Sequence, residues 1–193
     1  MELALEEKKI LMEIARNSIK ALFYDGVKPV DEKVIKQFPV LEKKAGAFVT
    51  LTEDKRLRGC IGYIIADRPL YKTIADAAVQ AATNDPRFPE LTKEEFDRID
   101  LEISVLSEPF PIESYDDIIV GKHGLILTEG FHRGLLLPQV PIEHNMNKEQ
   151  YLTSLCHKAG LHGNCWKEKQ LNLEAFTANV FSENDLTEEE DDS

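Results

Sequence analysis

The stretch LRGCIG at residues 57–62 places a cysteine between two glycines within an otherwise strand-like run. Glycine weakens the interior of a strand, so the pair predicts a β-bulge or a close approach of another group to the backbone. Cys60 supplies a thiol, and Arg58 supplies a guanidinium that favours the thiolate. Gly59 and Gly62 leave backbone N–H groups open to an anion. We therefore expect a functional site here.

The segments around this stretch predict a hairpin between two helices. Residues 45–51 and 57–65 are β-rich, and the polar residues between them form a connection short enough for a hairpin. Apolar residues recur at helical spacing over 3–23, which predicts an amphipathic helix. A second helix is predicted from Pro69 to Asn84, and its alanines imply close packing.

The rest of the chain continues this mixture of elements. It contains an alternating strand, a second hairpin, a helix and a last strand, predicted at Ile99–Leu106, at 124–127 with 134–137, at 147–159 and at 175–181. Helices lie between pairs of strands and do not follow every strand. This order favours an α+β fold with a mainly antiparallel central sheet flanked by helices.

Charge limits the classes of partner. The 193 residues carry a formal net charge of −12, but seven acidic residues lie between 183 and 192, which leaves −5 for residues 1–182. An acidic body has no general attraction for phosphate backbones, so we expect no general nucleic-acid-binding surface. We expect one domain over residues 1–182, followed by an acidic, disordered tail over 183–193.

The cysteine count and the hydropathy of the chain indicate where in the cell the protein works. Three cysteines are an odd number, and the N-terminus does not couple a basic region to a long apolar run. We therefore expect reduced thiols and a cytoplasmic protein. No run approaches the roughly 20 apolar residues of a membrane helix, so we expect no membrane partner.

A second candidate site lies in the proline-bracketed loop at residues 84–90, which presents Asp85 and Arg87. In one reading the loop closes on a substrate, with Arg87 gripping an anionic group and Asp85 orienting it. In the other reading the two residues form an internal brace, as is common in a rigid connector. Glu102, on an alternating strand, faces either solvent or the same site.

A zinc site among Cys156, His157, His162 and Cys165 is not expected. Two of these residues are adjacent on a predicted helix, where neighbouring side chains point about 100° apart. The paired spacings typical of zinc ligands are also missing. We therefore predict no metal site, and the sequence identifies no cofactor.

Six ordered motifs make the chain resemble the AMMECR-domain family, also called AmmeMemoRadiSam system protein A. They are LRGCIG at 57–62, DPRF at 85–88, ISVL at 103–106, GKHGL at 121–125, LLPQV at 136–140 and KAGL at 158–161. The resemblance covers about residues 3–181. It implies a larger and a smaller subdomain with a cleft between them, and an association with a Memo-like protein and a radical S-adenosylmethionine protein. It supplies no established reaction.

Two classes of function remain open. In the first, the protein is an enzyme or enzyme component that binds a small or nucleotide-like anionic substrate beside Cys60, which acts as a nucleophile with His123 as its base. The substrate-binding residues would be Arg58, Gly59, Gly62, Asp85, Arg87 and Gln139. In the second, Cys60 is a small buried residue and the protein is a non-catalytic binding or scaffold module for the same partners.

Overall fold

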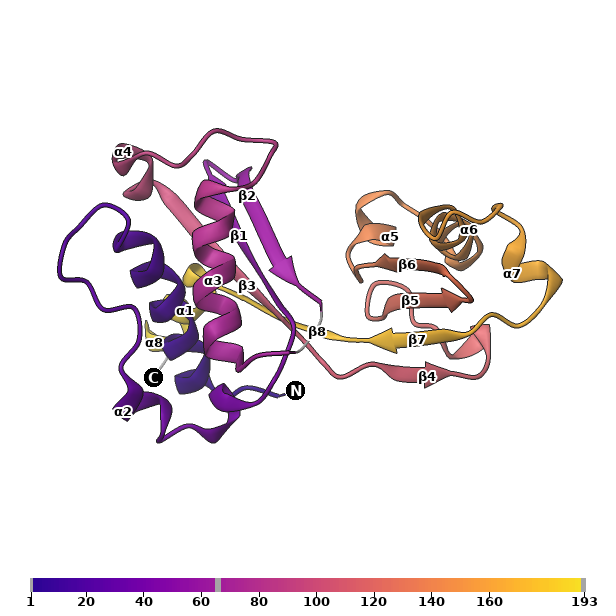
Figure 1. Cartoon of the computed structure of the whole chain (residues 1–193), viewed down its shortest axis with the longest axis horizontal. Helices are drawn as coiled ribbons and strands as arrows, with labels where there is room; N and C mark the ends of the chain where they lie inside the picture. Colours follow the sequence, from indigo (N-terminus) through magenta and orange to yellow (C-terminus); the bar gives the residue numbers. More distant parts are fainter. Residues whose placement is uncertain (1, 65–66, 192–193) are drawn as a thin grey trace. The chain divides into compact units, whose positions relative to one another are not determined.

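The structure is a computed structural model that describes residues 2–64 and 67–191 and contains two compact units (Figure 1). Unit 1 comprises residues 1–106 and 179–193, and unit 2 comprises residues 107–178. The predicted α+β class with antiparallel pairing is confirmed. The strands form two four-stranded sheets, whereas the sequence predicted one central sheet. The cleft between subdomains stays a prediction.

Unit 1 combines one sheet with two long helices. The sheet has the order β2-β1-β3-β8, and β1 pairs antiparallel with both β2 and β3. Its strands are β1 (Ala47–Glu53), β2 (Arg56–Tyr63), β3 (Ile99–Leu106) and β8 (Ala178–Ser182). Its helices are α1 (Leu5–Lys20), α2 (Glu32–Ile35), the 3-10 helix η1 (Pro39–Glu42), α3 (Leu70–Thr83), α4 (Lys93–Phe96) and α8 (Glu183–Asp191).

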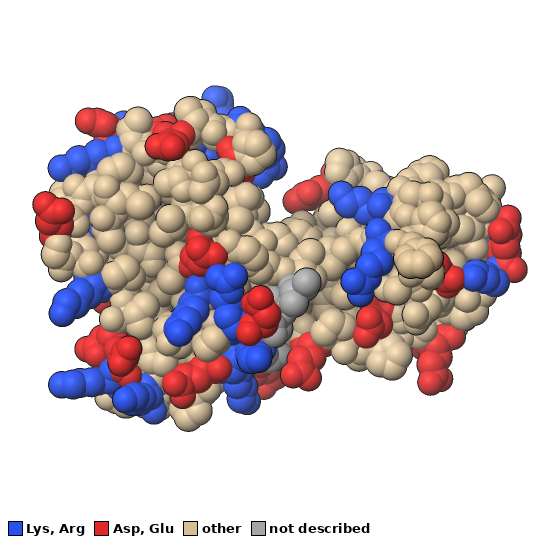
Figure 2. Space-filling model, viewed as in Figure 1, with Lys and Arg blue, Asp and Glu red and all other residues tan. Residues whose placement is uncertain are grey.

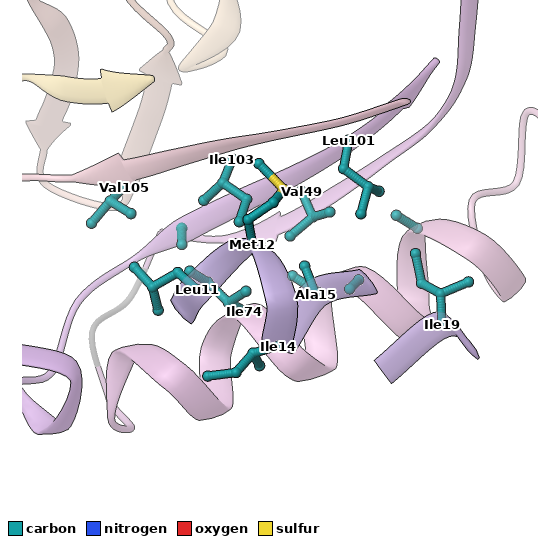
Figure 3. Close-up of a cluster of buried hydrophobic side chains, with 14 of the residues drawn as sticks. Leu11, Met12, Ile14, Ala15, Ile19, Val49, Ile74, Leu101, Ile103 and Val105 are labelled. Carbon is teal, nitrogen blue, oxygen red and sulfur yellow. The ribbon is translucent and has the colours of Figure 1, made fainter. Parts of the chain in front are cut away.

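The core of unit 1 lies between the two long helices and one face of the sheet (Figure 3). Helix α1 packs on α3, and α3 packs on β1 and β2. Alternate residues of β1, namely Ala47, Val49 and Leu51, are buried against these helices. Side chains alternate between the faces of a strand, so Phe48 and Thr50 belong to the opposite face. We call this opposite face the open face, because its side chains are half-buried or exposed.

Unit 2 packs helix α6 on a smaller sheet of order β4-β7-β5-β6. Its strands are β4 (Phe110–Ile112), β5 (Gly124–Glu129), β6 (His132–Leu136) and β7 (Leu173–Phe176). Its helices are the 3-10 helix η2 (Tyr115–Asp117), α5 (Val140–Glu143), α6 (Lys148–Lys158) and α7 (Cys165–Glu168). The hydroxyl of the buried Tyr151 donates to the carbonyl of His123, which ties α6 to the segment before β5.

The last predicted strand, residues 175–181, is divided in the structure. Strand β7 ends at Phe176 and belongs to the second sheet, whereas β8 begins at Ala178 and belongs to the first. Between them, the Thr177 N–H donates to the hydroxyl of Ser107 and the Ser107 N–H donates to the Thr177 carbonyl. This pairing with the chain that leaves β3 lets one apolar run serve two sheets.

Residues 183–191 form helix α8, where the sequence predicted a disordered tail. Glu183 accepts hydrogen bonds from Nε of Arg16 at 2.8 Å and from the Leu101 N–H at 2.9 Å. Ser182 and Asp185 cap the helix start reciprocally. Composition alone assigns these acidic side chains to a solvated tail. In the structure, Glu183 and Asp185 have hydrogen-bond partners, and negative charge is favourable at the N-terminus of a helix.

Two of the three cysteines form a disulfide, whereas the sequence predicted reduced thiols. Cys156 on α6 is bonded to Cys165 on α7, and Cys60 remains free. An odd count leaves one cysteine over but does not forbid a pair. Because both sulfur atoms are in the disulfide, neither is available to a metal. Within residues 2–64 and 67–191, no group of three or more His, Cys, Asp or Glu side chains could hold an ion.

Charges are mixed on the surface. On the face shown in Figure 2, basic and acidic side chains are interspersed. No helix within the described part of the chain is long and apolar enough to cross a lipid bilayer.

Candidate functional site

The glycine-flanked cysteine lies on β2, at one edge of the first sheet. Leu51 of β1 faces Gly59, but Thr52 faces Leu57, so Arg58 is an extra residue on β2. One extra residue in one strand of an antiparallel pair is a β-bulge. The irregularity predicted from the two glycines is therefore confirmed.

Each glycine admits a close neighbour from the chain itself. A Cβ on Gly59 would lie 2.3 Å from the carbonyl oxygen of Ala81 on α3. A Cβ on Gly62 would lie 2.3 Å from Cγ of Phe48, on the open face. The predicted close approach to the backbone is confirmed, and packing within unit 1 explains both residues. Their role as N–H donors to a substrate stays a prediction.

Asp85 ties the loop after α3 to the edge strand. Its Oδ2 accepts the N–H of Cys60 at 2.8 Å, and its Oδ1 accepts the N–H of Arg87 at 3.1 Å. The guanidinium of Arg87 adds contacts of 2.7 Å to Oδ2 and 3.0 Å to Oδ1. Asp85 is only 4% exposed, and the Arg87 guanidinium holds the pKa of its carboxyl well below the usual range. This geometry is the internal brace of the second reading of the loop.

Arg87 differs from Asp85 because its side chain is 54% exposed. Its Nη2 lies 3.5 Å from the carbonyl oxygen of Cys60, and its guanidinium stacks against the ring of Phe88 at 5.6 Å. The pairing with Asp85 holds the guanidinium beside Cys60, where its charge lowers the pKa of the thiol. The guanidinium beside the thiol is thus that of Arg87, where the sequence predicted that of Arg58.

The Cys60 thiol is half-buried on the open face and carries a proton at neutral pH. Its pKa is raised, mainly because burial disfavours the thiolate, with smaller contributions from the charges of Asp85 and Glu102. The hydroxyl of Thr50 donates to Sγ at 3.2 Å and, with Arg87, opposes this shift. A reaction of this sulfur therefore requires a proton acceptor.

Three polar side chains form a row across the open face. Thr50 on β1 lies opposite Cys60 on β2 and opposite Glu102 on β3. Residues directly opposite each other in a sheet share a face, so the carboxylate, hydroxyl and thiol are neighbours. Burial raises the pKa of Glu102, and the charge of Asp185 on α8 adds to the effect. Sequence reasoning missed Thr50, because the bulge at Arg58 shifts the register of the hairpin and so decides which residue lies opposite Cys60.

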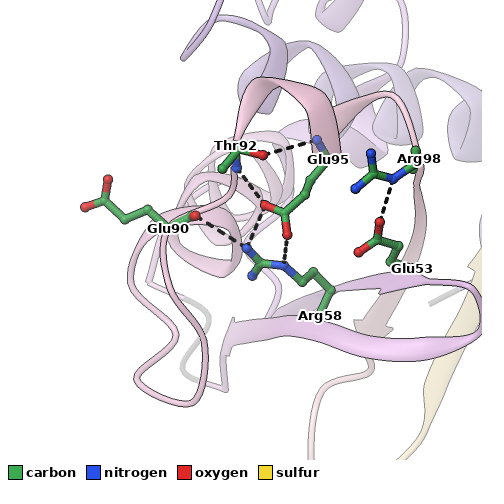
Figure 4. Close-up of polar contacts among 6 residues, drawn as sticks. All are labelled: Glu53, Arg58, Glu90, Thr92, Glu95 and Arg98. Carbon is green, nitrogen blue, oxygen red and sulfur yellow. Dashed lines mark hydrogen bonds and ion pairs between the residues drawn. The ribbon is translucent and has the colours of Figure 1, made fainter.

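Arg58 braces the segment before β3 (Figure 4). Its Nε and Nη2 each lie 2.9 Å from the carboxylate of Glu95, and Nη2 lies 3.4 Å from the carbonyl of Glu90. Its side chain is 9% exposed. The guanidinium lowers the pKa of Glu95 to about 2. These contacts favour a structural role, and the predicted substrate contact of Arg58 stays a prediction.

His123 belongs to unit 2 and is 8% exposed. Its Nδ1 accepts the N–H of Ile119 at 3.2 Å, and its ring meets the edge of Phe110 at 5.4 Å. Burial, with a smaller effect of the Lys122 charge, lowers its pKa, so the imidazole is neutral at pH 7. With Nδ1 accepting, the proton sits on Nε2, which makes His123 a hydrogen-bond donor rather than a base at that atom.

The predicted residues therefore fall into two sets. Unit 1 holds one set together around β2, which consists of Arg58, Gly59, Cys60, Gly62, Asp85 and Arg87. Unit 2 holds His123 and the exposed Gln139, whose carbonyl accepts the N–H groups of Ile142 and Glu143 at the start of α5. The first set is a site in its own right.

A protein-family model matches most of the chain. The AMMECR1 family model matches residues 12–181, which include every predicted site residue. The chain belongs to the AMMECR1 family. This confirms the resemblance given by the six motifs.

Two relatives and one solved structure show how similar the chain is to other proteins. Protein MJ0810 of Methanocaldococcus jannaschii is 45% identical over 159 residues, which cover 78% of this chain and 79% of the relative. A protein of Thermococcus gammatolerans is 39% identical over 187 residues, which cover 91% and 89%. The crystal structure of the uncharacterised protein PH0010 from Pyrococcus horikoshii is similar, with a TM-score of 0.75, 38% identity, and coverage of 90% and 89%.

Proposed function

We propose that this AMMECR1-family protein is an enzyme or enzyme component that binds a small or nucleotide-like anionic substrate on the open face, beside Cys60. One observation carries the proposal: Asp85 fixes an exposed arginine next to the free thiol. A guanidinium whose position is already set by a buried carboxylate loses little entropy when it binds an anion. Its exposed edge is free to meet a carboxylate or phosphate group.

The chemistry proposed for Cys60 is attack on an electrophilic centre of that substrate. Because the thiol is protonated at neutral pH, its proton would pass to the substrate atom that receives the electrons of the bond that breaks as the bond from sulfur forms. Thr50 already contacts the sulfur, and the positive charge of Arg87 would favour the developing thiolate. A Memo-like protein and a radical S-adenosylmethionine protein would act with it, on the same substrate or its product.

A second function is favoured by the raised pKa of Cys60. A half-buried, protonated thiol is a poor nucleophile, and burial alone is enough to explain a small residue at this position. In this alternative the open face still binds the anionic molecule through Arg87, but the protein is a non-catalytic module. It would deliver the molecule to the same partners or act as their scaffold.

Alkylation tests the anion site that both functions share. Because Cys156 and Cys165 are joined, iodoacetamide modification of the folded protein reports Cys60. We expect AMP or inorganic phosphate to slow this modification, and Arg87→Gln to abolish the protection. Arg98→Gln is the matched control, since Arg98 is an equally exposed arginine paired with Glu53. Absence of protection in the wild-type protein would argue against an anion site at Arg87.

Turnover is tested by untargeted metabolite profiling. The wild-type protein and Cys60→Ser are compared, alone and with the Memo-like and radical S-adenosylmethionine partners. A product that requires Cys60 supports the enzyme. Binding without any Cys60-dependent product supports the non-catalytic module.

A further inference from the structure

The row across the open face ends in an acidic group without a cationic partner. The side chain of Glu102 makes no hydrogen bond or ion pair with any residue in 2–64 or 67–191, and the residue is exposed. Two other carboxylates beside β2 have cationic partners: Asp85 pairs with Arg87, and Glu95 pairs with Arg58. Glu102 therefore stands out as a negative charge available to an outside group.

Its surroundings make a bound cation favourable. The charge that contributes to the raised pKa of Glu102 is that of Asp185 on α8, which has the same sign. The sheet also removes part of the water around the carboxylate. A cation at this place would relieve the repulsion and restore the lost solvation, whereas an anion would be repelled.

The opposite end of the row has the opposite charge. Cys60 is followed, beyond the edge of the sheet, by the exposed guanidinium of Arg87. Glu102 and Cys60 are separated by the width of β1, which is two interstrand spacings, or about 10 Å. Thr50 lies midway. Apolar surface borders the row at Phe48 and at Val180, which is 52% exposed.

We propose that the molecule bound on the open face is bipolar: its anionic group meets Arg87, its amine or other cationic group meets Glu102, and its middle passes over Thr50 and Cys60. This inference rests on the proposed anion site. Because Arg87 lies beyond Cys60, it narrows the substrate class to zwitterions whose charges are more than about 10 Å apart. An ω-amino carboxylate with a flexible methylene chain is the simplest member of that class.

The test uses NMR titration of the isotope-labelled full chain with ω-amino carboxylates of increasing length. Alkyl carboxylates and alkylamines of matched length are the monofunctional probes. We expect ω-amino carboxylates that span the row to bind more tightly than either, by about fivefold, as befits a partly exposed ion pair. Glu102→Gln should remove this gain and leave the alkyl carboxylate unaffected. Asp100→Asn, an exposed acid two residues earlier on β3, should remove nothing.

The pH dependence of ligand affinity gives a second test of the role of Glu102. The groups that act on the site are Arg87, Asp85, Cys60, Glu102 and Asp185. Protonation of Glu102 removes its charge, so the gain from the amine should disappear as pH falls through the pKa of that residue, which is raised above 4.5. The alkyl carboxylate should keep its affinity over that range, until the probe itself becomes protonated.

The possible results are distinct. If carboxylates bind through Arg87 but Glu102→Gln changes nothing, the bipolar substrate is refuted and the anion site stands. If no probe with a carboxylate binds, the anion site is refuted together with this inference. Circular dichroism of each variant establishes that it is folded, so a loss of binding is not mistaken for unfolding.

Discussion

The replacement of Gly59 by alanine gives a quantitative test of the packing behind the cysteine. The added Cβ would lie 2.3 Å from the carbonyl oxygen of Ala81 and 3.2 Å from its carbonyl carbon. Both atoms belong to the backbone of α3, so relief requires movement of the helix or the strand. Overpacking of this kind costs about 1–3 kcal/mol. A 2.3 Å approach to backbone atoms belongs at the upper end of that range, and alanine regains only about 0.5–1 kcal/mol from its lower chain entropy, so we expect a net loss of about 2–2.5 kcal/mol.

Urea denaturation measures this loss. Far-UV circular dichroism follows the helices of both units, of which α1 and α3 in unit 1 are the longest, while the fluorescence of Trp166 follows unit 2 alone. We expect Gly59→Ala to lower the midpoint of the dichroism transition without changing its slope. Gly62→Ala should also destabilise unit 1, because its Cβ would lie 2.3 Å from Cγ of Phe48 and 2.5 Å from the carbonyl oxygen of Ala47. A Gly59→Ala variant as stable as the wild-type protein would refute the close approach of α3.

Three further predictions concern the braces of the two units. Arg58→Ala should lower the free energy of unfolding by about 2–4 kcal/mol, because it leaves the carboxylate of Glu95 without its partner. In the wild-type protein, the stability that this ion pair provides should be lost as pH falls from 4.5 towards 2, because the pKa of Glu95 is depressed in the folded state. Cys156→Ser, or dithiothreitol, should destabilise unit 2 by about 2–3 kcal/mol, measured by Trp166 fluorescence. Glu183→Gln should lower the melting temperature by a few degrees, since it weakens the charge-assisted bonds to Arg16.

Each of these has a contradicting outcome. An acid titration that is the same with and without Arg58 would exclude the ion pair with Glu95. If dithiothreitol has no effect on the Trp166 transition, the disulfide does not support the fold of unit 2. If Glu183→Gln melts like the wild-type protein, helix α8 is held by Leu186 alone, which is buried in the core of unit 1.

Local patterns predicted most elements because they reflect local physics. The alternation over Ile99–Leu106 gives β3 with the same bounds, and the predicted helix from Pro69 to Asn84 appears as α3 (Leu70–Thr83). The errors come from distant partners. Nothing near residue 177 shows that Ser107 pairs with it, and nothing near Glu183 shows that Arg16 contacts it. The reciprocal cap of Ser182 and Asp185 was a readable local signal for α8.

The candidate site shows the same division. The glycines predicted an irregular strand with close neighbours, and the prolines around Asp85 predicted a rigid loop, because both effects arise within a few residues. Which arginine reaches the thiol depends on the bulge and on the fold of a loop about 25 residues away. Sequence distance favoured Arg58, whereas the folded chain pairs Arg58 with Glu95 and brings Arg87 to Cys60.

The hydrogen bond between the Cys60 N–H and Asp85 also bears on solubility. Strand β2 is an edge, and an unpaired amide there invites a strand from another molecule to add to the sheet. Asp85 occupies that amide, and its charge deters a second strand. Because the paired carboxyl stays ionised well into the acid range, this protection against aggregation should outlast that of ordinary surface acids as pH falls.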